Sequence, residues 1–523
     1  MDELIGALHQ TTSAILASCT LTPPPTVESH KKNDQNPIAG CGPAVADLLR
    51  RQAALVLELH DGPADDVPGP ATKGGAVKAR CLWRRLDDLL ELADAKFLAF
   101  RFEVLPDCWR QLYVDVRVLM FHVGVLRSRL RGGGDESWGD GDEVEVVAEV
   151  SNEVDELVKV LDMAMIVAGG GPGGGRHLIN RLLGLLERAW NARRAKRASG
   201  PDRRDAKRQK AHHDLYDDEV LLWKEAPLFS DAAAFEPPVS RPAERIDGVS
   251  MDSFQKYIDP ATNPEPVTPI IFTDLMEDWP ALTGRPWSRP AYLLSRTFGG
   301  RRYVPIEIGR SYVDEGWTQK LIPFKEFLET YIDPSVAPSP TPNPTAPPKG
   351  YLAQHDLFAQ IPSLRNDILL PDYLWTDPPP HPDPKQNKPK VASPQLNAWF
   401  GPASTITPLH TDSMHNLLCQ VVGRKYVRLY PPSCAAAMRP RGVEGGVDMG
   451  NTSSVDLGAV EGWDAVDVDD EEACLSEEDV ERFKAAEYWD CVLEPGETLY
   501  IPIGWWHYVR SLSVSFSVSF WWN

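Results

Sequence analysis

The stretch LNAWFGPASTITPLHTDSMHNLLCQVVGRKYVRLYPP, residues 396–432, decides how the C-terminal half of this chain folds. It contains the strand KYVRLY near its end and carries His410-Thr-Asp412 upstream of that strand. On an extended chain, residues i and i+2 point to the same side, so the imidazole and the carboxylate converge on one point. His-x-Asp alone is a weak signal, but here it predicts two ligands of a metal site.

A third ligand is expected far along the chain, and GETLYIPIGWWHYVR, residues 496–510, supplies His507 at the end of an apolar strand. Two histidines and one carboxylate on one face of an octahedron leave three coordination positions open. That arrangement suits non-haem Fe(II), which must bind a bidentate cosubstrate and still admit dioxygen. A closed zinc site would need four protein ligands and more sulfur.

Lys425 follows His410 by fifteen residues and stands on the KYVRLY strand. An iron-bound 2-oxoglutarate needs a cation at the far end of its pocket for its second carboxylate, and an ammonium group serves as that point charge. Thr407 and Asn416 lie close enough in sequence to add neutral hydrogen bonds. A lone lysine would be taken for an exposed one, but beside the three ligands it predicts a 2-oxoglutarate site.

Six strings in this half form a set: PLHTD, GRKYVRLY, YLAQHDLF, VPIEIG, LNAWFGP and HYVRSLSVSFSVSFWW. Together they resemble jumonji-C oxygenases, and more narrowly the lysine-specific demethylase eight or jumonji domain-containing protein five family. The resemblance covers residues 240–523. It implies iron at His410, Asp412 and His507, with Fe(II), 2-oxoglutarate and dioxygen as the cofactor and cosubstrates.

The same resemblance implies two further groups of residues. Contacts to 2-oxoglutarate are expected from Tyr351, Thr407, Asn416 and Lys425. Glu307, in VPIEIG, and Trp399 correspond to positions that line the substrate cleft. Structural roles are expected for His415 and His355, because a fourth ligand would fill a position that oxygen or the cosubstrate needs.

The predicted fold class is α+β, an all-helical N-terminal region followed by a double-stranded β-helix of the jumonji-C, cupin-like type. Helical spacing supports the first part, since apolar residues recur at Leu82, Leu86, Leu89, Leu90, Ala93 and Phe97. Similar stripes run from Val154 to Met165 and from Leu178 to Ala189, and the glycine-rich segments near 132–143 and 169–175 interrupt them. These stripes indicate helices that pack on one another.

The expected domains are a helical domain at 1–192, a basic linker at 193–239 and the oxygenase domain at 240–523. Residues 193–210 are basic within an acidic protein, which fits a nuclear-import signal or a solvated linker about equally. A proline-rich stretch at 334–349 and a glycine-rich, acidic stretch at 441–482 are predicted to be loop insertions.

The closing segment alternates Ser513, Ser515, Ser517 and Ser519 with apolar residues. That period of two predicts a strand with one buried face. Because nothing after it could form a helical dimerisation element, a monomer is expected.

The formal net charge of −21 argues against a general nucleic-acid binder and suits a basic protein or peptide substrate, such as a histone, a chromatin-associated protein or a ribosomal protein. The sequence contains no apolar run of about 18 residues, so no membrane span is expected. The start, MDELIGALHQTT, lacks a secretory pattern. A nuclear or cytoplasmic location is therefore expected.

Hydroxylation of an arginine side chain is the first functional hypothesis, because Glu307 can pair with a guanidinium at two points. The alternative is histone methyl-lysine demethylation. A non-catalytic cupin-like binding module is a second alternative, since fold alone does not give function. Recruitment of a partner through the helical region is a further possibility.

Overall fold

The computed structural model describes residues 1–20, 37–62, 75–100, 104–128, 143–198, 228–231, 235–314, 316–333, 349–444, 446–464 and 475–523. The chain divides into two compact units. One comprises residues 1–219 with 301–303, and the other comprises residues 220–300 with 304–523. The predicted linker at 193–239 falls mostly outside the described residues, so the domain boundary and the import signal stay predictions.

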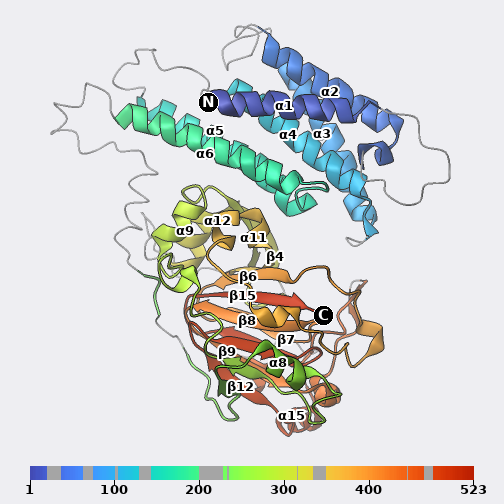
Figure 1. Ribbon diagram of the computed structural model, residues 1–523, viewed down its shortest axis with the longest axis vertical. Coiled ribbons are helices and arrows are strands. Elements are labelled where there is room, and N and C mark those ends of the chain that lie inside the picture. The colour runs from blue at the N-terminus through green and yellow to red at the C-terminus, as the bar shows by residue number, and fades with distance from the viewer. Residues whose placement is uncertain are drawn as a thin grey trace, which may run out of the picture. The chain divides into compact units, whose positions relative to one another are not determined.

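The N-terminal unit is helical in its described residues. Its elements are α1 (Asp2–Ser18), the 3-10 turn η1 (Pro37–Cys41), α2 (Pro43–Asp61), α3 (Gly75–Ala99), α4 (Asp107–Arg127), α5 (Glu143–Ala168) and α6 (Gly175–Ala198). α4 packs against α3 and α5, and α1 packs against α2 (Figure 1). Each of the three predicted stripes contributes buried residues, among them Leu86, Leu161 and Leu182. The helical prediction for this region is confirmed.

The glycine-rich turn between α5 and α6 explains why α5 ends at Ala168 and α6 begins at Gly175. Gly170 has a φ of 77°, a conformation that side chains disfavour. A Cβ on Gly175 would lie 2.1 Å from the carbonyl oxygen of Gly170. Only glycine therefore allows the chain to double back so closely. Across the described part of the chain, no helix combines the length and apolar character needed to span a bilayer.

The second unit is built around β-sheets. Its strands are β1 (Glu244–Ile246), β2 (Ile270–Phe272), β3 (Tyr303–Ile308), β4 (Thr318–Pro323), β5 (Gly350–His355), β6 (Gln395–Gly401), β7 (Ile406–His410), β8 (His415–Val422), β9 (Lys425–Tyr430), β10 (Val443–Glu444), β11 (Val447–Asp448), β12 (Trp489–Leu493), β13 (Thr498–Ile501), β14 (Trp506–Ser511) and β15 (Ser515–Trp522). A nine-stranded sheet has the order β1-β2-β13-β8-β15-β6-β5-β3-β4. A four-stranded sheet has the order β12-β9-β14-β7. The arrangement is the expected cupin-like fold (Figure 1).

Short helices and turns connect and cover these strands. They are α8 (Met251–Ile258), η6 (Pro280–Leu282), α9 (Pro290–Arg296), α10 (Phe324–Phe327), the π-helical turn η7 (Leu328–Ile332), α11 (Leu357–Gln360), α12 (Pro362–Arg365), η9 (Asp372–Trp375), η10 (Pro384–Gln386), η11 (Pro432–Cys434), α13 (Ala435–Met438), α14 (Leu457–Val460) and α15 (Glu477–Lys484). Local sequence sets their starts. The Ser476 side chain, for example, accepts a hydrogen bond from the Asp479 amide and caps α15.

The two large sheets share an apolar layer, and each carries a further core on its other face. Along β9, Val427 and Leu429 enter the layer between the sheets. Tyr426 and Tyr430 point the opposite way, and Tyr430 contacts Phe483 of α15 with ring centroids 5.3 Å apart. The period of two along this strand therefore separates the interior of the barrel from its outer packing.

The serine alternation predicts β15 correctly, but the expectation of one buried face is wrong. Ser515, Ser517 and Ser519 are as fully buried as the apolar residues between them. Their hydroxyls have partners inside the barrel: Ser517 donates to Gln420 Oε1 at 2.7 Å, and Gln420 Nε2 donates to Ser515 Oγ at 3.0 Å. Trp399 Nε1 donates to Ser519 Oγ at 2.9 Å. Paired hydroxyls can be buried at little cost, so the serine face did not need solvent.

The stretch predicted as a loop insertion at 441–482 differs from that expectation in its described residues. It contains the β10–β11 hairpin, α14 and the first part of α15, and Val455 and Leu457 join the core outside the four-stranded sheet. Residues 465–474 and most of the insertion at 334–349 lie outside the described residues.

Candidate metal and cosubstrate site

Three side chains converge where β7 and β14 lie side by side. His410 ends β7, Asp412 follows two residues later, and His507 of β14 pairs in register with His410. His410 Nε2 lies 3.7 Å from Asp412 Oδ1, and His507 Nε2 lies 3.6 Å from Asp412 Oδ2. The three ligand atoms all lie within 4.8 Å of one another. Among the described residues, this is the one group of His, Cys, Asp or Glu that could hold a metal ion.

Both imidazoles are oriented by the backbone two residues upstream. Nδ1 of His410 donates to the Pro408 carbonyl at 2.8 Å, and Nδ1 of His507 donates to the Trp505 carbonyl at 3.1 Å. A carbonyl oxygen only accepts, so each Nδ1 carries the proton and each Nε2 keeps its lone pair. Donation from the non-ligating nitrogen is the usual arrangement of metal-binding histidines.

The electrostatics of the trio also suit a cation. Burial, together with the neighbouring His410, holds the pKa of His507 well below its usual value, so its lone pair is free at neutral pH. Burial raises the pKa of Asp412, while His410 and the Asn416 side chain oppose that rise. A divalent cation between these groups would restore the carboxylate charge that burial disfavours.

The predicted iron and 2-oxoglutarate residues, with Trp399, line one pocket. Its lining comprises Tyr351, Trp399, Thr407, His410, Asp412, Asn416, Leu418, Lys425, Ile501, His507 and Val509. Its three aliphatic side chains belong to the apolar layer between the two sheets, and most of the others are polar. A pocket lined mostly by converging polar side chains, with an apolar layer behind them, suits a small polar ligand.

Lys425 provides the test of whether a dicarboxylate fits here. Its side chain is 1% exposed, and Nζ donates to the Tyr351 hydroxyl at 3.3 Å. No carboxylate of the described residues lies within ion-pair distance of this amine, and burial lowers its pKa to about 7. Asn416 Oδ1 is also buried, and it has no hydrogen-bond partner among the described residues. Buried polar groups of this kind call for a ligand, and an anion that also reaches the metal trio satisfies both ends.

Glu307 is the predicted site residue that the structure does not bring into this cavity. It lies on β3, where it pairs in register with Tyr351 of β5, one strand away. Burial raises the pKa of Glu307, and a contact from Trp317 opposes the rise. Its predicted role toward substrate stays a prediction.

His415 and His355 both lie outside the metal trio. His415 Nε2 donates to the Pro379 carbonyl at 3.0 Å, while Nδ1 accepts from the Tyr500 hydroxyl at 2.8 Å. Burial lowers the pKa of His415 to about 4, so it stays neutral. His355 pairs with Gln360 Oε1 at 2.7 Å. Ring nitrogens of both residues are therefore hydrogen-bonded to other groups of the fold.

Sequence reasoning missed two residues beside the site, Tyr312 and Thr452. The Tyr312 hydroxyl lies 3.2 Å from Thr452 Oγ1, and the backbone of Thr452 forms an antiparallel β-bridge with that of His410. Neither residue belongs to a motif with recognisable spacing. They approach the site only because the fold brings the segment after β3 and the 441–464 segment to the end of β7.

Comparisons with known proteins agree with this geometry. Residues 265–523 match the family model described as a cupin-like domain. The chain is 34% identical over 372 residues to lysine-specific demethylase 8 of Danio rerio, which covers 71% of this chain and 75% of that protein. Since 372 aligned residues cannot fit within 240–523, the alignment includes part of the helical region.

Two other relatives match over a shorter range. Lysine-specific demethylase JMJ30 of Arabidopsis thaliana is 40% identical over 282 residues, 54% of each chain. Jumonji C domain-containing protein 5 of Drosophila melanogaster is 35% identical over 281 residues, 53% of this chain and 59% of that protein. The chain thus spans little more than half the length of these two relatives.

Proposed function

Since this chain belongs to the jumonji-C family of cupin-like, 2-oxoglutarate-dependent oxygenases, we propose that it oxidises a side chain of a protein substrate and removes methyl groups from N-methyl-lysine. The names of its relatives in zebrafish and Arabidopsis support this reaction over arginine hydroxylation, which is the first hypothesis from the sequence. The observation that carries the proposal is the buried amine of Lys425, which has no carboxylate partner among the described residues and lines the same cavity as the His410, Asp412 and His507 trio.

Each polar group of the cavity has a distinct task in this proposal. His410, Asp412 and His507 would hold Fe(II). Lys425 and Tyr351 hold the distal carboxylate of 2-oxoglutarate, and Thr407 and Asn416 add neutral hydrogen bonds. The iron, with 2-oxoglutarate and dioxygen, supplies the oxidation that places an oxygen atom on a C–H bond, with succinate and carbon dioxide as coproducts.

The remaining residues aim the reaction and exclude water. Leu418, Ile501 and Val509 form an apolar wall, which keeps the oxidation away from bulk solvent. If the C–H bond belongs to an N-methyl group of lysine, the hydroxymethyl product releases formaldehyde and leaves the amine with one methyl group fewer. The position of the substrate nitrogen relative to the trio therefore determines the product.

A second candidate is hydroxylation of an arginine side chain, and one observation favours it. Glu307 is half-buried, and no Lys, Arg or His of the described residues lies within ion-pair distance of its carboxyl group. A substrate guanidinium could pair with that carboxylate at two points. The negative net charge of the chain suits a basic protein substrate for either of the two candidate reactions.

A mass measurement separates the two reactions. The protein is incubated with Fe(II), 2-oxoglutarate and matched peptides that contain either methylated lysine or unmodified arginine. Loss of a methyl group supports demethylation, and gain of one oxygen on the arginine peptide supports hydroxylation. Neither change, together with no succinate above the level of a His410→Ala control, would favour the non-catalytic binding module and overturn the proposal.

A further inference from the structure

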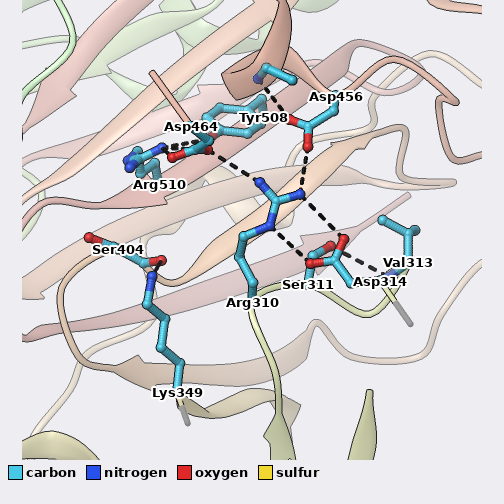
Figure 2. A network of polar contacts seen from close by, with 11 residues as sticks. Arg310, Ser311, Val313, Asp314, Lys349, Ser404, Asp456, Asp464, Tyr508 and Arg510 are labelled. Carbon is cyan, nitrogen blue, oxygen red and sulfur yellow. Dashed lines mark hydrogen bonds and ion pairs between the residues drawn. The ribbon is translucent and has the colours of Figure 1, made fainter. Parts of the chain in front are cut away.

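Arg310, just after β3, joins three carboxylates that come from two different segments of the chain (Figure 2). Its guanidinium donates to Asp314 from Nε at 2.9 Å and from Nη2 at 3.3 Å. Nη2 also donates to Asp456 Oδ2 at 2.5 Å, and Nη1 donates to Asp464 Oδ2 at 3.3 Å. The guanidinium therefore ties its own turn to the segment that the sequence had marked as an insertion.

Asp464 extends this network to the barrel strand that carries His507. Arg510 of β14 donates from Nη1 to both carboxylate oxygens of Asp464 at 2.9 Å (Figure 2). Arg510 is 5% exposed, and the Asp464 side chain is 15% exposed. One carboxylate thus connects the turn after β3 to a strand of the metal site.

The two acidic partners are held in place by α14. Asp456 caps this helix by accepting from the Ala459 amide at 3.2 Å, while its other oxygen accepts from Arg310. Gly458 leaves the space that Asp464 fills, since a Cβ there would lie 2.1 Å from Asp464 Oδ2. Contacts other than those to Arg310 therefore also position these two carboxylates.

The same segment also runs beside the metal-binding strand. The Thr411 amide donates to the Asn451 carbonyl at 2.8 Å, and the Ser453 amide donates to the Leu409 carbonyl at 2.8 Å. His410 and Thr452 lie opposite each other in this short pairing. Residues 451–453 act as an added strand along the end of β7.

Tyr312 stands on the turn that Arg310 fixes, close to the site. Burial raises its pKa, and the nearby carboxylates of Glu307 and Asp412 raise it further, while the contact to Thr452 opposes the rise. The geometry gives the same link, since the Tyr312 hydroxyl lies 3.2 Å from Thr452 Oγ1 and Thr452 lies opposite His410. A shift of this turn would move the substrate side of the site.

We propose that Arg310, with Asp456 and Asp464, is a positioning latch that fixes the turn carrying Tyr312 beside the metal site and so sets the binding of the protein substrate. This inference rests on the proposed function for the existence of that substrate. The latch touches none of the residues predicted to hold iron or 2-oxoglutarate. Its loss should therefore affect the protein substrate and leave the binding of both cofactors intact.

Two opening variants disrupt the contacts between Arg310 and its acidic partners in different ways. Arg310→Gln removes the charge, while Gly458→Ala keeps every charge and displaces Asp464. Arg310→Lys should rescue in part, because an ammonium keeps the charge and loses the two-point contact to Asp314. Arg482→Gln is the matched control, since it removes an exposed arginine that pairs with Glu478 on α15.

The measured quantities are the KM for the peptide substrate, the KM for 2-oxoglutarate and the ratio of succinate formed to peptide oxidised. In both opening variants we expect the peptide KM to rise about 10- to 100-fold, as misplacement by an ångström costs in other sites, and the succinate ratio to increase. The KM for 2-oxoglutarate should stay within about twofold of the wild type. The control should match the wild type in all three.

Hydrogen exchange of residues 309–314 gives a readout that does not need activity. Faster exchange in Arg310→Gln and not in Arg482→Gln supports the latch, and unchanged exchange overturns it. Unchanged peptide KM in both opening variants overturns the positioning role alone, because wild-type turnover would still support the proposed function. No turnover of any peptide by the wild type would overturn the proposed function itself.

Discussion

Replacement of Lys425 by methionine should stabilise the apoprotein and at the same time weaken its use of 2-oxoglutarate. The amine is fully buried, and without ligand it has the neutral Tyr351 hydroxyl as its hydrogen-bond partner. Methionine has nearly the same shape and carries no charge. The substitution therefore removes a buried cation without opening a large cavity.

The magnitude follows from the protonation equilibrium. Burial lowers the pKa of Lys425 from 10.5 to about 7. Each pKa unit corresponds to about 1.4 kcal/mol, so this shift corresponds to on the order of 5 kcal/mol of unfavourable free energy for burying the charged amine. That value is an upper bound for the stability gained by the substitution. Between pH 7 and 10.5 the unfolded chain binds a proton at this position that the folded chain lacks, so wild-type stability rises with pH in that range.

The assay is urea unfolding of the metal-free protein without 2-oxoglutarate, at pH 7 and pH 10. Lys425→Met should be more stable than the wild type by about 2–4 kcal/mol at pH 7, and by less than about 1 kcal/mol at pH 10. The exposed Lys390→Met serves as the control and should change neither value. In turnover, the KM for 2-oxoglutarate should rise about 10- to 100-fold in Lys425→Met, because a charge-assisted bond is lost.

Two results would refute this reasoning. A Lys425→Met variant that is less stable than the wild type at pH 7 would mean that the amine has a stabilising partner in the apoprotein. An unchanged KM for 2-oxoglutarate would mean that the cosubstrate carboxylate binds elsewhere.

Three further predictions concern the ligands and the barrel interior. His410→Ala should lower succinate formation at least about 1000-fold, and chelation of the wild type should do the same until Fe(II) is restored, since two protein ligands hold the ion poorly; retained activity would contradict the assignment. For His415, whose pKa is lowered to about 4, wild-type stability should be lost as pH falls from 6.5 towards 4. The advantage of the wild type over His415→Gln in urea should therefore shrink by about 2 kcal/mol between pH 7 and 4.5, and a constant difference would argue against a neutral buried ring. Gln420→Leu should lower the free energy of unfolding by about 2–4 kcal/mol in the same assay, because it leaves the carbonyls of Val422 and Gly423 and the β15 hydroxyls without their hydrogen-bond partner. An unchanged free energy of unfolding would show that these groups find other partners.

The predicted metal and cosubstrate residues lie together in one pocket, and the sequence could single them out because their chemistry limits the choice. His410 and Asp412 follow from spacing along a strand, and a cation such as Lys425 is required by any bound dicarboxylate. The structure gathers these residues in one cavity with His507 from a distant strand. Glu307 is a different case, since it lies on the strand next to Tyr351 of the cavity lining and its role toward the substrate stays a prediction.

Other features depended on partners that no local pattern contains. The alternation in β15 gave the strand and its period, yet its serine face is buried because Gln420 and Trp399 pair with it. The insertion looked like a solvated loop because it is rich in glycine and acid. Asp456 and Asp464 instead bind arginines that lie more than a hundred residues earlier or on a later strand. Charge composition alone cannot distinguish an acid that faces water from one that faces an arginine.

The position of β15 has a consequence for how the barrel forms. This strand lies between β8 and β6 in the middle of the nine-stranded sheet, and contacts such as Trp399 to Ser519 join residues 120 positions apart. Contacts of such high sequence separation make folding slow, since chain entropy is lost before they form. Until β15 arrives, β8 exposes an edge and eight residues that are all buried in the finished fold. The half-formed barrel is therefore the state most prone to aggregate, and conditions that speed the docking of β15 should raise the yield of soluble protein.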